Sequence, residues 1–451
     1  MLLEQWKDWT GCRTTTPARK VVKNGRAHTG FQERAPRAAV LSVALAALAA
    51  MFISAFSGGA LAQNCVGTTG PCFQGLGFLT LTPPNSIAPD SQGSGISPDG
   101  SIVVGFSIDT LGNSQAFRWS NGTMTGLSYF NASQCSSTIP CYSYAYGVNA
   151  LGVIAGYASY TYSLPNNLST TDQAFTYSGS GLQGLGFLCT TQLEGPYGTE
   201  ATAIASQATV VVGSAGDTGC NGPSSEAAAF ANAGINPLGL LSSGTSGFSL
   251  ANAVNATGQV IVGQSTNNTS GLQAFVWQNG LTGLPYLHGT DNSSSANAVS
   301  ALGAIIAGAS GGSSSVEAVR WVNGAVADLG WPGVAAGISA NGNVVVGSGS
   351  GTCGGAVRWT PVDACQIIYN LLAEAGVTGF GAWSLQNATA VSATGTTITG
   401  YGLDPNGHTQ AWIARLPAPG GPNAVHDFNA TATATFCFAT PAPHPARWRC
   451  G

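Results

Sequence analysis

One pattern recurs seven times along the chain, and this repeat constrains the fold more than any other feature of the sequence. Each copy has a short apolar segment, a turn, three apolar residues closed by glycine, a variable stretch, and alanine followed by an aromatic residue or valine. The closing glycines stand at positions 105, 156, 213, 263, 308, 347 and 400. The alanine pairs are Ala116-Phe117, Ala174-Phe175, Ala229-Phe230, Ala274-Phe275, Ala318-Val319, Ala356-Val357 and Ala411-Trp412.

Each full copy contains four short apolar segments separated by turn signals. Tight turns such as Pro98-Asp99-Gly100 separate the first two segments, and Asn-Gly pairs such as Asn121-Gly122 separate the last two. Asn-Gly supplies the positive φ of a two-residue hairpin turn. Four antiparallel strands in a repeat of about 40–50 residues are typical of a β-propeller blade, so we predict an all-β propeller of seven four-stranded blades. An open β-solenoid is the alternative.

The two ends of the array favour a closed ring. The seventh copy has strands at 388–392, 397–401 and 410–416 but lacks a fourth before Pro417. Residues 73–79 resemble the fourth segment of copy two. We therefore expect this N-terminal strand to pair with 410–416 and complete the last blade, which removes exposed sheet edges.

Copy six departs from the pattern after Trp359. Apolar residues at 367, 368, 371 and 372 have helical spacing and are followed by Gly376, a typical helix C-cap. This spacing predicts a helix packed outside the ring.

Charged residues are scarce, at 7% of the 451 residues, where an ordinary soluble domain has roughly 25%. The net charge of −4 offers no basic stripe, so a nucleic-acid-binding protein is excluded, and the shortage of Glu and Lys excludes a coiled coil. Eight of the 14 Lys and Arg residues lie within 1–62, which leaves the rest of the chain acidic.

Residues 1–62 have the three parts of a secretory leader. A basic segment ends at Arg37, an apolar run covers 38–56, and Ala60-Leu61-Ala62 precedes the expected cut. The alternative is an N-terminal membrane anchor. No second apolar run is long enough to span a bilayer, so we expect no membrane span after removal of the leader.

The chain thus divides into a leader (1–62), a repeat β-propeller (63–417) and a Pro-, Ala- and Thr-rich tail (418–451) that we expect to be disordered. Its location is predicted to be extracellular, either secreted or at the cell surface, with the periplasm as an alternative.

Ten cysteines remain after the leader, an even number that favours disulfides in an oxidising compartment. Proximity in the sequence is the only basis for pairing them, because connectivity does not follow from sequence. The sequence contains no CxxC or Cys/His cluster and no phosphate loop ending in Gly-Lys, so we expect no metal and no cofactor. The candidate pairs are Cys65–Cys72, Cys135–Cys141, Cys189–Cys220, Cys353–Cys365 and Cys437–Cys450.

The repeat resembles the HAF-repeat family of bacterial extracellular proteins, named for a His-Ala-Phe element, over roughly residues 73–417. This chain departs from the family at the His, so any role tied to that His does not carry over. The resemblance implies an exported bacterial protein with repeated β-structure, and it implies no chemistry. The positions that match the His are Gln115, Gln173, Ala228, Gln273, Glu317, Gly355 and Gln410.

Function is expected on the face that carries the long connections. In a four-stranded antiparallel blade, the connections after the second and fourth strands emerge on one rim, and here those are the long ones, for example 158–172 and 128–145. Six of the 12 Tyr residues lie between 142 and 162 in this region. Tyr146 and Tyr157 are expected to be packing residues. The predicted binding residues are Tyr142, Tyr144, Tyr160, Tyr162 and Asp172.

The sequence favours a non-enzymatic binding module whose ligand is a glycan or a protein. No Ser-His-Asp signature is present, and two loop pairs, His288 with Asp291 and His408 with Asp404, are the candidates for acid–base work. The alternatives are a glycan hydrolase or lyase built on acids of the long loops, and a structural surface or matrix protein.

Overall fold

The computed structural model describes residues 65–419, apart from 136–140, 165–167, 192–194, 218–221, 224, 232–233, 245–246 and 313–314, together with the backbone of 437–439 and 448–450. The chain divides into two compact units, Met1–Gly58 and Gly59–Gly451, and the described residues all belong to the second. The predicted leader therefore lies outside the described residues. Among these residues, no helix is both long and apolar enough to cross a membrane.

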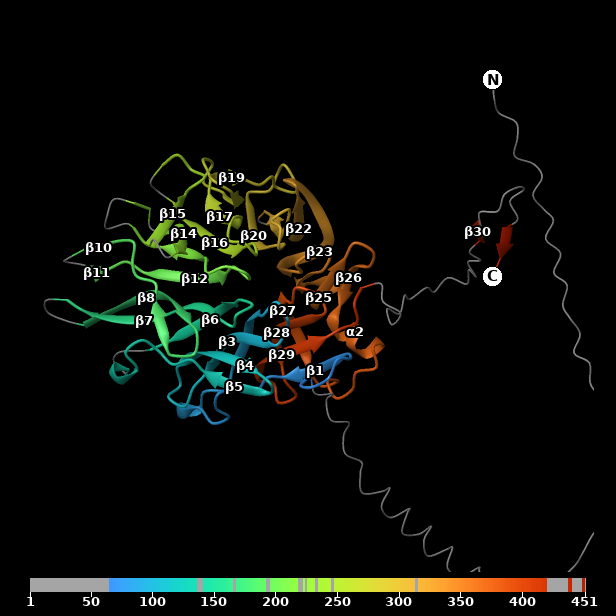
Figure 1. Cartoon of the computed structure of the whole chain (residues 1–451), viewed down its shortest axis with the longest axis horizontal. Helices are drawn as coiled ribbons and strands as arrows, with labels where there is room; N and C mark the ends of the chain where they lie inside the picture. Colours follow the sequence, from blue (N-terminus) through green and yellow to red (C-terminus); the bar gives the residue numbers. More distant parts are fainter. Residues whose placement is uncertain are drawn as a thin grey trace, which may run out of the picture. The chain divides into compact units, whose positions relative to one another are not determined.

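The described residues form seven four-stranded antiparallel blades, one for each sequence repeat, as predicted (Figure 1). Blade 1 is β2 (Ser91–Ile96), β3 (Ile102–Ile108), β4 (Ser114–Ser120) and β5 (Thr123–Gly126), and blade 2 is β6 (Ser143–Val148), β7 (Ile154–Ser163), β8 (Leu168–Tyr177) and β9 (Leu182–Gly184). Blade 3 is β12 (Thr199–Ile204), β13 (Val211–Ala215), β14 (Glu226–Ala231) and β15 (Gly234–Gly239), and blade 4 is β16 (Ser249–Val254), β17 (Ile261–Thr266), β18 (Leu272–Trp277) and β19 (Leu281–Gly283).

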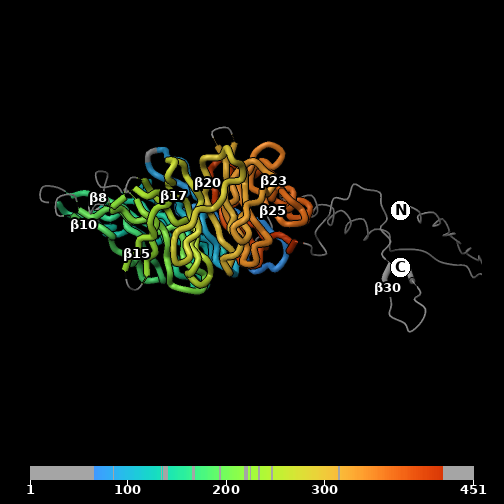
Figure 2. The backbone as a smooth tube through the Cα atoms, turned by 90° about the horizontal axis from the view of Figure 1, so that it is seen from above, coloured from blue at the N-terminus to red at the C-terminus, as the bar shows by residue number. Residues whose placement is uncertain are grey.

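The long strand β23 (Ala325–Ile338) is shared, because its first half ends blade 5 and its second half begins blade 6. The remaining strands of blade 5 are β20 (Ser293–Val299), β21 (Ile305–Gly311) and β22 (Val316–Val322), and those of blade 6 are β24 (Val345–Gly349), β25 (Gly355–Thr360) and β26 (Ala364–Ile367). Blade 7 is β27 (Ser384–Val391), β28 (Thr397–Leu403), β29 (Thr409–Arg415) and β1 (Cys72–Gly75). In Figure 2 the colours pass from green through yellow to orange from blade to blade, so consecutive repeats are neighbours in space.

The N-terminal strand closes the ring as predicted. Strand β1 pairs antiparallel with β29, from Cys72 opposite Arg415 to Gly75 opposite Trp412. The Leu76 N–H extends this ladder by donating to the carbonyl of Ala411 at 2.8 Å. The closing strand is thus the first strand in the sequence, but in space it is the outermost strand of blade 7. It gives blade 7 its fourth strand.

Both faces of each blade are buried against its neighbours, which explains why the strands are apolar without alternation. The aromatic residue after alanine is fully buried in four copies, at Phe117, Phe175, Phe275 and Trp412. Each of these rings lies in a separate cluster of small aliphatic residues. The repeat therefore encodes interfaces between blades.

A belt of β-bulges surrounds the central channel. The first strand of every described blade has a bulged residue that lines the channel. Strand β27 has a second bulge, at Gln386, outside this belt. Several bond across to the next blade: Asn252 donates to the carbonyl of Ala296 at 3.0 Å, and Asn297 to that of Ala335 at 3.0 Å. The belt consists of Ser94, Tyr146, Thr202, Asn252, Asn297, Ala336 and Thr389.

The structure corrects the alignment of copy three. Gly213 pairs with Ala228, as Gly105 pairs with Phe117, so Ala227-Ala228 and not Ala229-Phe230 is the equivalent alanine pair. The residue at the family's His position in this copy is consequently Glu226, not Ala228. The prediction failed because three alanines in a row allow two registers and the aromatic ring of Phe230 favoured the wrong one.

Two further expectations concern local structure. The helix expected in copy six is present as α2 (Ile368–Glu374), but it follows a regular fourth strand, β26, that the sequence did not reveal. The stretch 158–172 is largely not a loop, because β7 extends to Ser163 and β8 starts at Leu168. The two strands pair over this stretch and form a hairpin that projects from blade 2.

Three of the proposed disulfides are present, namely Cys65–Cys72, Cys135–Cys141 and Cys353–Cys365. Cys189 is disulfide-bonded, and its predicted partner Cys220 lies outside the described residues. Several disulfides fit an oxidising compartment.

In the tail, β30 (Cys437–Ala439) pairs with β31 (Trp448–Cys450), with Cys437 opposite Cys450. Short elements within the connections are η1 (Pro84–Ser86), η2 (Ala132–Gln134), η4 (Gly351–Cys353), β10 (Thr190–Thr191) and β11 (Gly195–Pro196).

Candidate functional site: a tyrosine ladder between blades 2 and 3

The rim that carries the connections after the second and fourth strands is here called the upper rim. On this rim, four tyrosines of blade 2 form a continuous row that we call the tyrosine ladder. The ring centroids of Tyr142 and Tyr144 are 6.0 Å apart, those of Tyr144 and Tyr157 5.3 Å, and those of Tyr157 and Tyr146 5.8 Å. The last pair is stacked, with an interplanar angle of 17°. The ladder brings together two predicted residues and two that the sequence assigned to packing.

The ladder faces blade 3. Tyr157 lies on the same side of β7 as Ala155, two residues before it, and Ala155 packs with Ala201 in the core between blades 2 and 3. Tyr144 is directly opposite Tyr157 in the pairing of β6 with β7 and so shares that side. All four rings are half-buried, which leaves part of each ring accessible.

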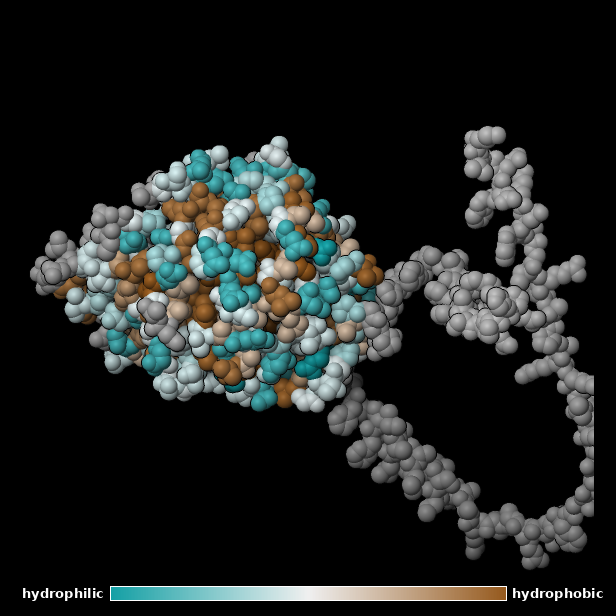
Figure 3. All heavy atoms as spheres, turned by 45° about the horizontal axis from the view of Figure 1, so that its top comes forward, coloured by the Kyte–Doolittle hydropathy of each residue, from teal (hydrophilic) through white to brown (hydrophobic). Residues whose placement is uncertain are grey.

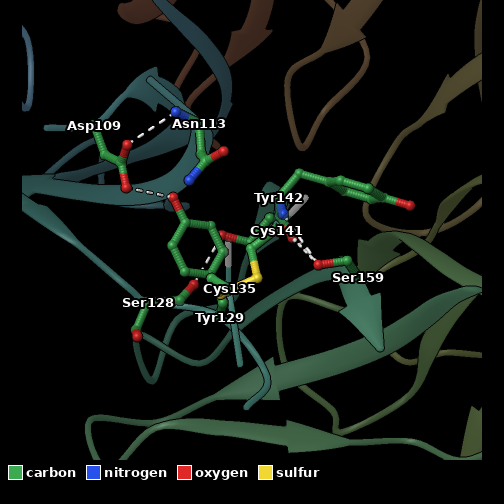
Figure 4. The surroundings of a disulfide bond; sticks show 9 residues. Asp109, Asn113, Ser128, Tyr129, Cys135, Cys141, Tyr142 and Ser159 are labelled. Carbon is green, nitrogen blue, oxygen red and sulfur yellow. Dashed lines mark hydrogen bonds between the residues drawn. A yellow bond between two sulfur atoms is a disulfide. The ribbon is translucent and has the colours of Figure 1, made fainter. Parts of the chain in front are cut away.

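Tyr142 is held in place from three directions, two of which, the disulfide beside it and Ser159, are seen in Figure 4. Its backbone N–H donates to Ser159 Oγ at 3.0 Å, and its hydroxyl donates to Asp172 Oδ1 at 2.7 Å. The preceding residue is Cys141, which is bonded to Cys135, and the ring of Tyr142 points away from this disulfide. The first ring of the ladder is therefore preorganised by a covalent link and two hydrogen bonds.

Two carboxylates accompany the rings. Asp172 lies on β8, opposite Ser159, and Glu200 lies on the first strand of blade 3. Burial raises the pKa of both groups, and the charge of Asp172 raises the pKa of Glu200 further, whereas the hydrogen bond from Tyr142 acts to lower that of Asp172. Burial also raises the pKa of the Tyr142 and Tyr157 hydroxyls, with further contributions from Asp172 at Tyr142 and from Tyr146 and the two carboxylates at Tyr157, so both remain neutral donors.

The lower end of the ladder reaches the central channel. Tyr146 is the bulged residue of β6, and it lines a channel cavity of about 290 Å³ together with Thr202 and Asn252. Phe106 of blade 1 meets the second ring of the ladder, Tyr144, edge-on, with ring centroids 5.0 Å apart. The ladder therefore runs from the upper rim into the channel mouth.

Two predicted binding residues lie elsewhere. Tyr160 and Tyr162 point to the opposite side of β7 from Tyr157, because they are an odd number of residues away from it. The ring of Tyr160 packs against Phe130 and Phe187, at 6.1 and 5.3 Å. The ring of Tyr162 covers Gly195 of the small β10–β11 hairpin, so closely that a Cβ there would overlap it.

The sequence did not single out Phe106, and Glu200 was expected only as one of several acids of the long loops, whereas it lies on β12. The sequence nevertheless contains a signal for both. Phe106 occupies in blade 1 the repeat position of Tyr157, since each pairs with the first strand one residue after the closing glycine. Glu200 occupies in blade 3 the position of Tyr144. The equivalent residues of blade 5, Ser295 and Ala309, are small. Comparing these two positions across copies points to blade 2, where both are aromatic, although Tyr401 also occupies the Tyr157 position in blade 7.

The residues proposed for acid–base work either shape their own loops or lie away from the tyrosine ladder. The carboxylate of Asp404 accepts the backbone N–H groups of Asn406 and His408 at 2.8 and 2.9 Å and so shapes its own loop. Asp109 bonds its loop in the same way. His288 Nε2 and Glu317 Oε2 are 2.9 Å apart on blade 5. Within the described part of the chain, no three His, Cys, Asp or Glu residues are grouped to hold a metal ion.

No protein-family model matches the chain, and no curated protein does either. Solved structures of β-propeller proteins resemble it in fold. The Dos1 propeller is 12% identical, with 79% of this chain and 88% of that one covered and a TM-score of 0.38. The Aleuria aurantia lectin in complex with α-methyl-L-fucoside is 12% identical, with 74% and 96% covered and a TM-score of 0.28. TolB from Acinetobacter baumannii is 14% identical with a TM-score of 0.33, and the match covers 52% of this chain and about half, 52%, of TolB.

Proposed function

We propose that this chain is an exported bacterial binding module that takes a glycan on the tyrosine ladder. The leader expected at 1–62 would direct it out of the cytoplasm, and the propeller at 63–417 would present the ladder at the cell surface or in the medium. The disulfides are compatible with such a compartment. The resemblance of its repeats to the HAF-repeat family supports the same location.

The single observation that carries the proposal is the row of half-buried rings flanked by carboxylates at one seam. Flat aromatic faces stack on the apolar faces of sugar rings, and tyrosine hydroxyls and carboxylates are hydrogen-bond partners for sugar hydroxyls. Tyr142 is already fixed by its bond to Asp172, so binding would order few side chains. On the face seen in Figure 3, hydrophobic and hydrophilic residues are interspersed.

A glycan array probed with the full-length exported chain tests the proposal. We expect wild-type protein to bind a defined set of oligosaccharides and a Tyr144→Ala, Tyr157→Ala variant to lose that binding. Tyr177→Ala is the matched control, because Tyr177 lies at the other end of β8, beside the lower rim of the same blade. Binding that survives in the ladder variant, or is lost equally in the control, would contradict the assignment.

Catalysis on a glycan is the second candidate, and the carboxylates favour it. Asp172 and Glu200 are close enough for one to raise the pKa of the other, and a glycosidase needs one protonated and one ionised carboxyl. Release of reducing ends from a bound oligosaccharide, lost in Glu200→Gln, would establish hydrolysis. Binding without such release would leave the binding module.

A further inference from the structure

The charges of the chain are distributed unevenly around the ring. No Lys or Arg occurs between Arg118 and Arg320, a stretch that contains blades 2, 3 and 4. The same stretch contains seven acids, which makes this half of the ring negative without internal compensation. They are Asp172, Glu194, Glu200, Asp217, Glu226, Asp291 and Glu317.

Register places the start of blade 3 on the upper rim, and two of the acids, Asp172 and Glu200, lie beside the ladder. Glu200 lies next to the start of β12 and opposite Ser214, and Glu226 starts β14. The starts of first and third strands and the ends of second strands all meet at that rim in an antiparallel blade. Asp172 adds a further carboxylate one strand away from Tyr157. The rings of the ladder thus lie in a field of negative charge.

The arginines of the described propeller are occupied elsewhere. Arg118 lines a groove with Leu151 and Gly152 at the turn between β6 and β7, which is on the lower rim. Arg320 lies over the ring of Trp359, 4.5 Å from its centroid. Arg358 is buried and donates to Gln366 Oε1 at 2.8 and 3.0 Å. Arg415, at the end of β29, donates to the carbonyl of Thr68. None of these four is placed to neutralise the ladder.

We propose that the ligand of the tyrosine ladder is a cationic oligosaccharide, one whose sugar rings carry free amino groups. This inference rests on the proposed function and narrows it. A sugar ring supplies the flat apolar face that stacks on Tyr144 and Tyr157, while an ammonium group on that ring reaches Asp172 or Glu200. The ammonium group also gains from the negative faces of the tyrosine rings.

A lysine-rich peptide fits the same charge less well. Its ammonium groups stand on flexible stems whose ordering has a large entropic cost, and the stems offer no ring to stack on the ladder. A pyranose ring holds its amino group rigidly beside a stacking face. The combination of stacked rings with negative charge that no neighbouring Lys or Arg balances therefore favours an amino sugar.

Isothermal titration calorimetry with the full-length exported chain tests the inference with four probes. These are a glucosamine oligomer, its N-acetylated form of the same length, a neutral glucose oligomer and a lysine oligomer. We expect the glucosamine oligomer to bind at least tenfold more tightly than its acetylated form, equivalent to about 1.4 kcal/mol, and to weaken as salt is added. The lysine oligomer is expected to bind more weakly than the glucosamine oligomer.

Variants then locate the effect. Asp172→Asn with Glu200→Gln should abolish the preference for the amino form while retaining weak stacking on the rings. The control is Glu374→Gln, which removes an exposed acid of α2 outside blade 6 and should leave the preference unchanged.

The outcomes separate the two proposals. Equal, ladder-dependent binding of the amino and acetylated oligomers would overturn the inference and leave glycan binding in place. Tighter binding of the lysine oligomer would overturn it in favour of a cationic peptide. No binding of any sugar probe, together with an empty glycan array, would overturn both.

Discussion

The closure of the ring by the N-terminal strand makes Phe73 a sensitive position. Its side chain is fully buried, and its ring contacts three aromatic rings: Trp383 at 5.1 Å, Phe380 at 5.8 Å and Trp412 at 6.3 Å. Truncation of a buried phenylalanine to alanine destabilises a protein by about 3–5 kcal/mol, because apolar area is exposed and a cavity remains. The free energy of unfolding of an ordinary domain is only about 5–15 kcal/mol. Phe73→Ala should therefore remove a large part of the free energy of unfolding.

Urea unfolding followed by tryptophan fluorescence measures this loss, with an expected decrease of about 3–5 kcal/mol in the free energy of unfolding. The matched control is Phe78→Ala, five residues further along the same segment, where the ring is half-exposed and meets only His408 among aromatic partners of the described residues. Its effect should be well below that of Phe73→Ala. Amide exchange should also accelerate in β28 and β29 before it does in blade 4. A loss below about 1 kcal/mol for Phe73→Ala, or uniform exchange in all blades, would refute ring closure by this strand.

Three other perturbations follow from the geometry. Replacing Cys65 and Cys72 by serine removes the covalent link next to the closing strand, and the urea midpoint should fall with the largest increase in exchange in blade 7; an unchanged midpoint contradicts this. Asn252→Ala removes a side-chain bond to blade 5 and should lower the free energy of unfolding by about 1 kcal/mol in the same assay, whereas no loss would show that the bulge belt does not stabilise the ring. Burial raises the pKa of Asp172 and Glu200, so each folded carboxylate binds its proton more tightly than the unfolded one, and ionisation opposes folding as pH rises. Asp172→Asn with Glu200→Gln should thus be more stable than wild type at neutral pH, and the gain should shrink as pH falls towards the ordinary carboxyl range; a constant difference across pH would contradict the cause.

The fold follows from the sequence because the repeat is present in many copies. Gly105 and its six equivalents each allow a neighbouring backbone to approach so closely that a Cβ would overlap it, as at the carbonyl of Gln92. Because no larger residue fits at this position, glycine recurs in every copy of the repeat, and counting these glycines gives the number of blades. Copy three shows the limit: in Ala227-Ala228-Ala229 no side chain marks the register, and only the pairing with Gly213 decides it.

The candidate site could be predicted only in part, because its residues come from three blades. Tyr142 and Asp172 were found as a tyrosine-rich segment and an acid in a supposed loop, but their bond depends on the hairpin formed by β7 and β8. Tyr160 belongs to the same segment, yet strand alternation turns it to the other side. Residues that are close in the sequence lie in the same region of the fold. Strand alternation then decides which of them point to the same face of the blade.

The two repeat positions at the channel mouth distinguish the blades from one another. In a ring of seven identical blades every blade would offer the same surface. A single binding site therefore requires that some copies of the repeat differ from the others. Here the departure is clearest in blade 2, where Tyr144 and Tyr157 make both positions aromatic, whereas in blade 5 both are small, Ser295 and Ala309. Replacing Tyr144, Tyr157 and Glu200 by the small residues of blade 5 should abolish binding while the fold is retained, because the fully buried residues between the blades, such as Phe175, stay in place.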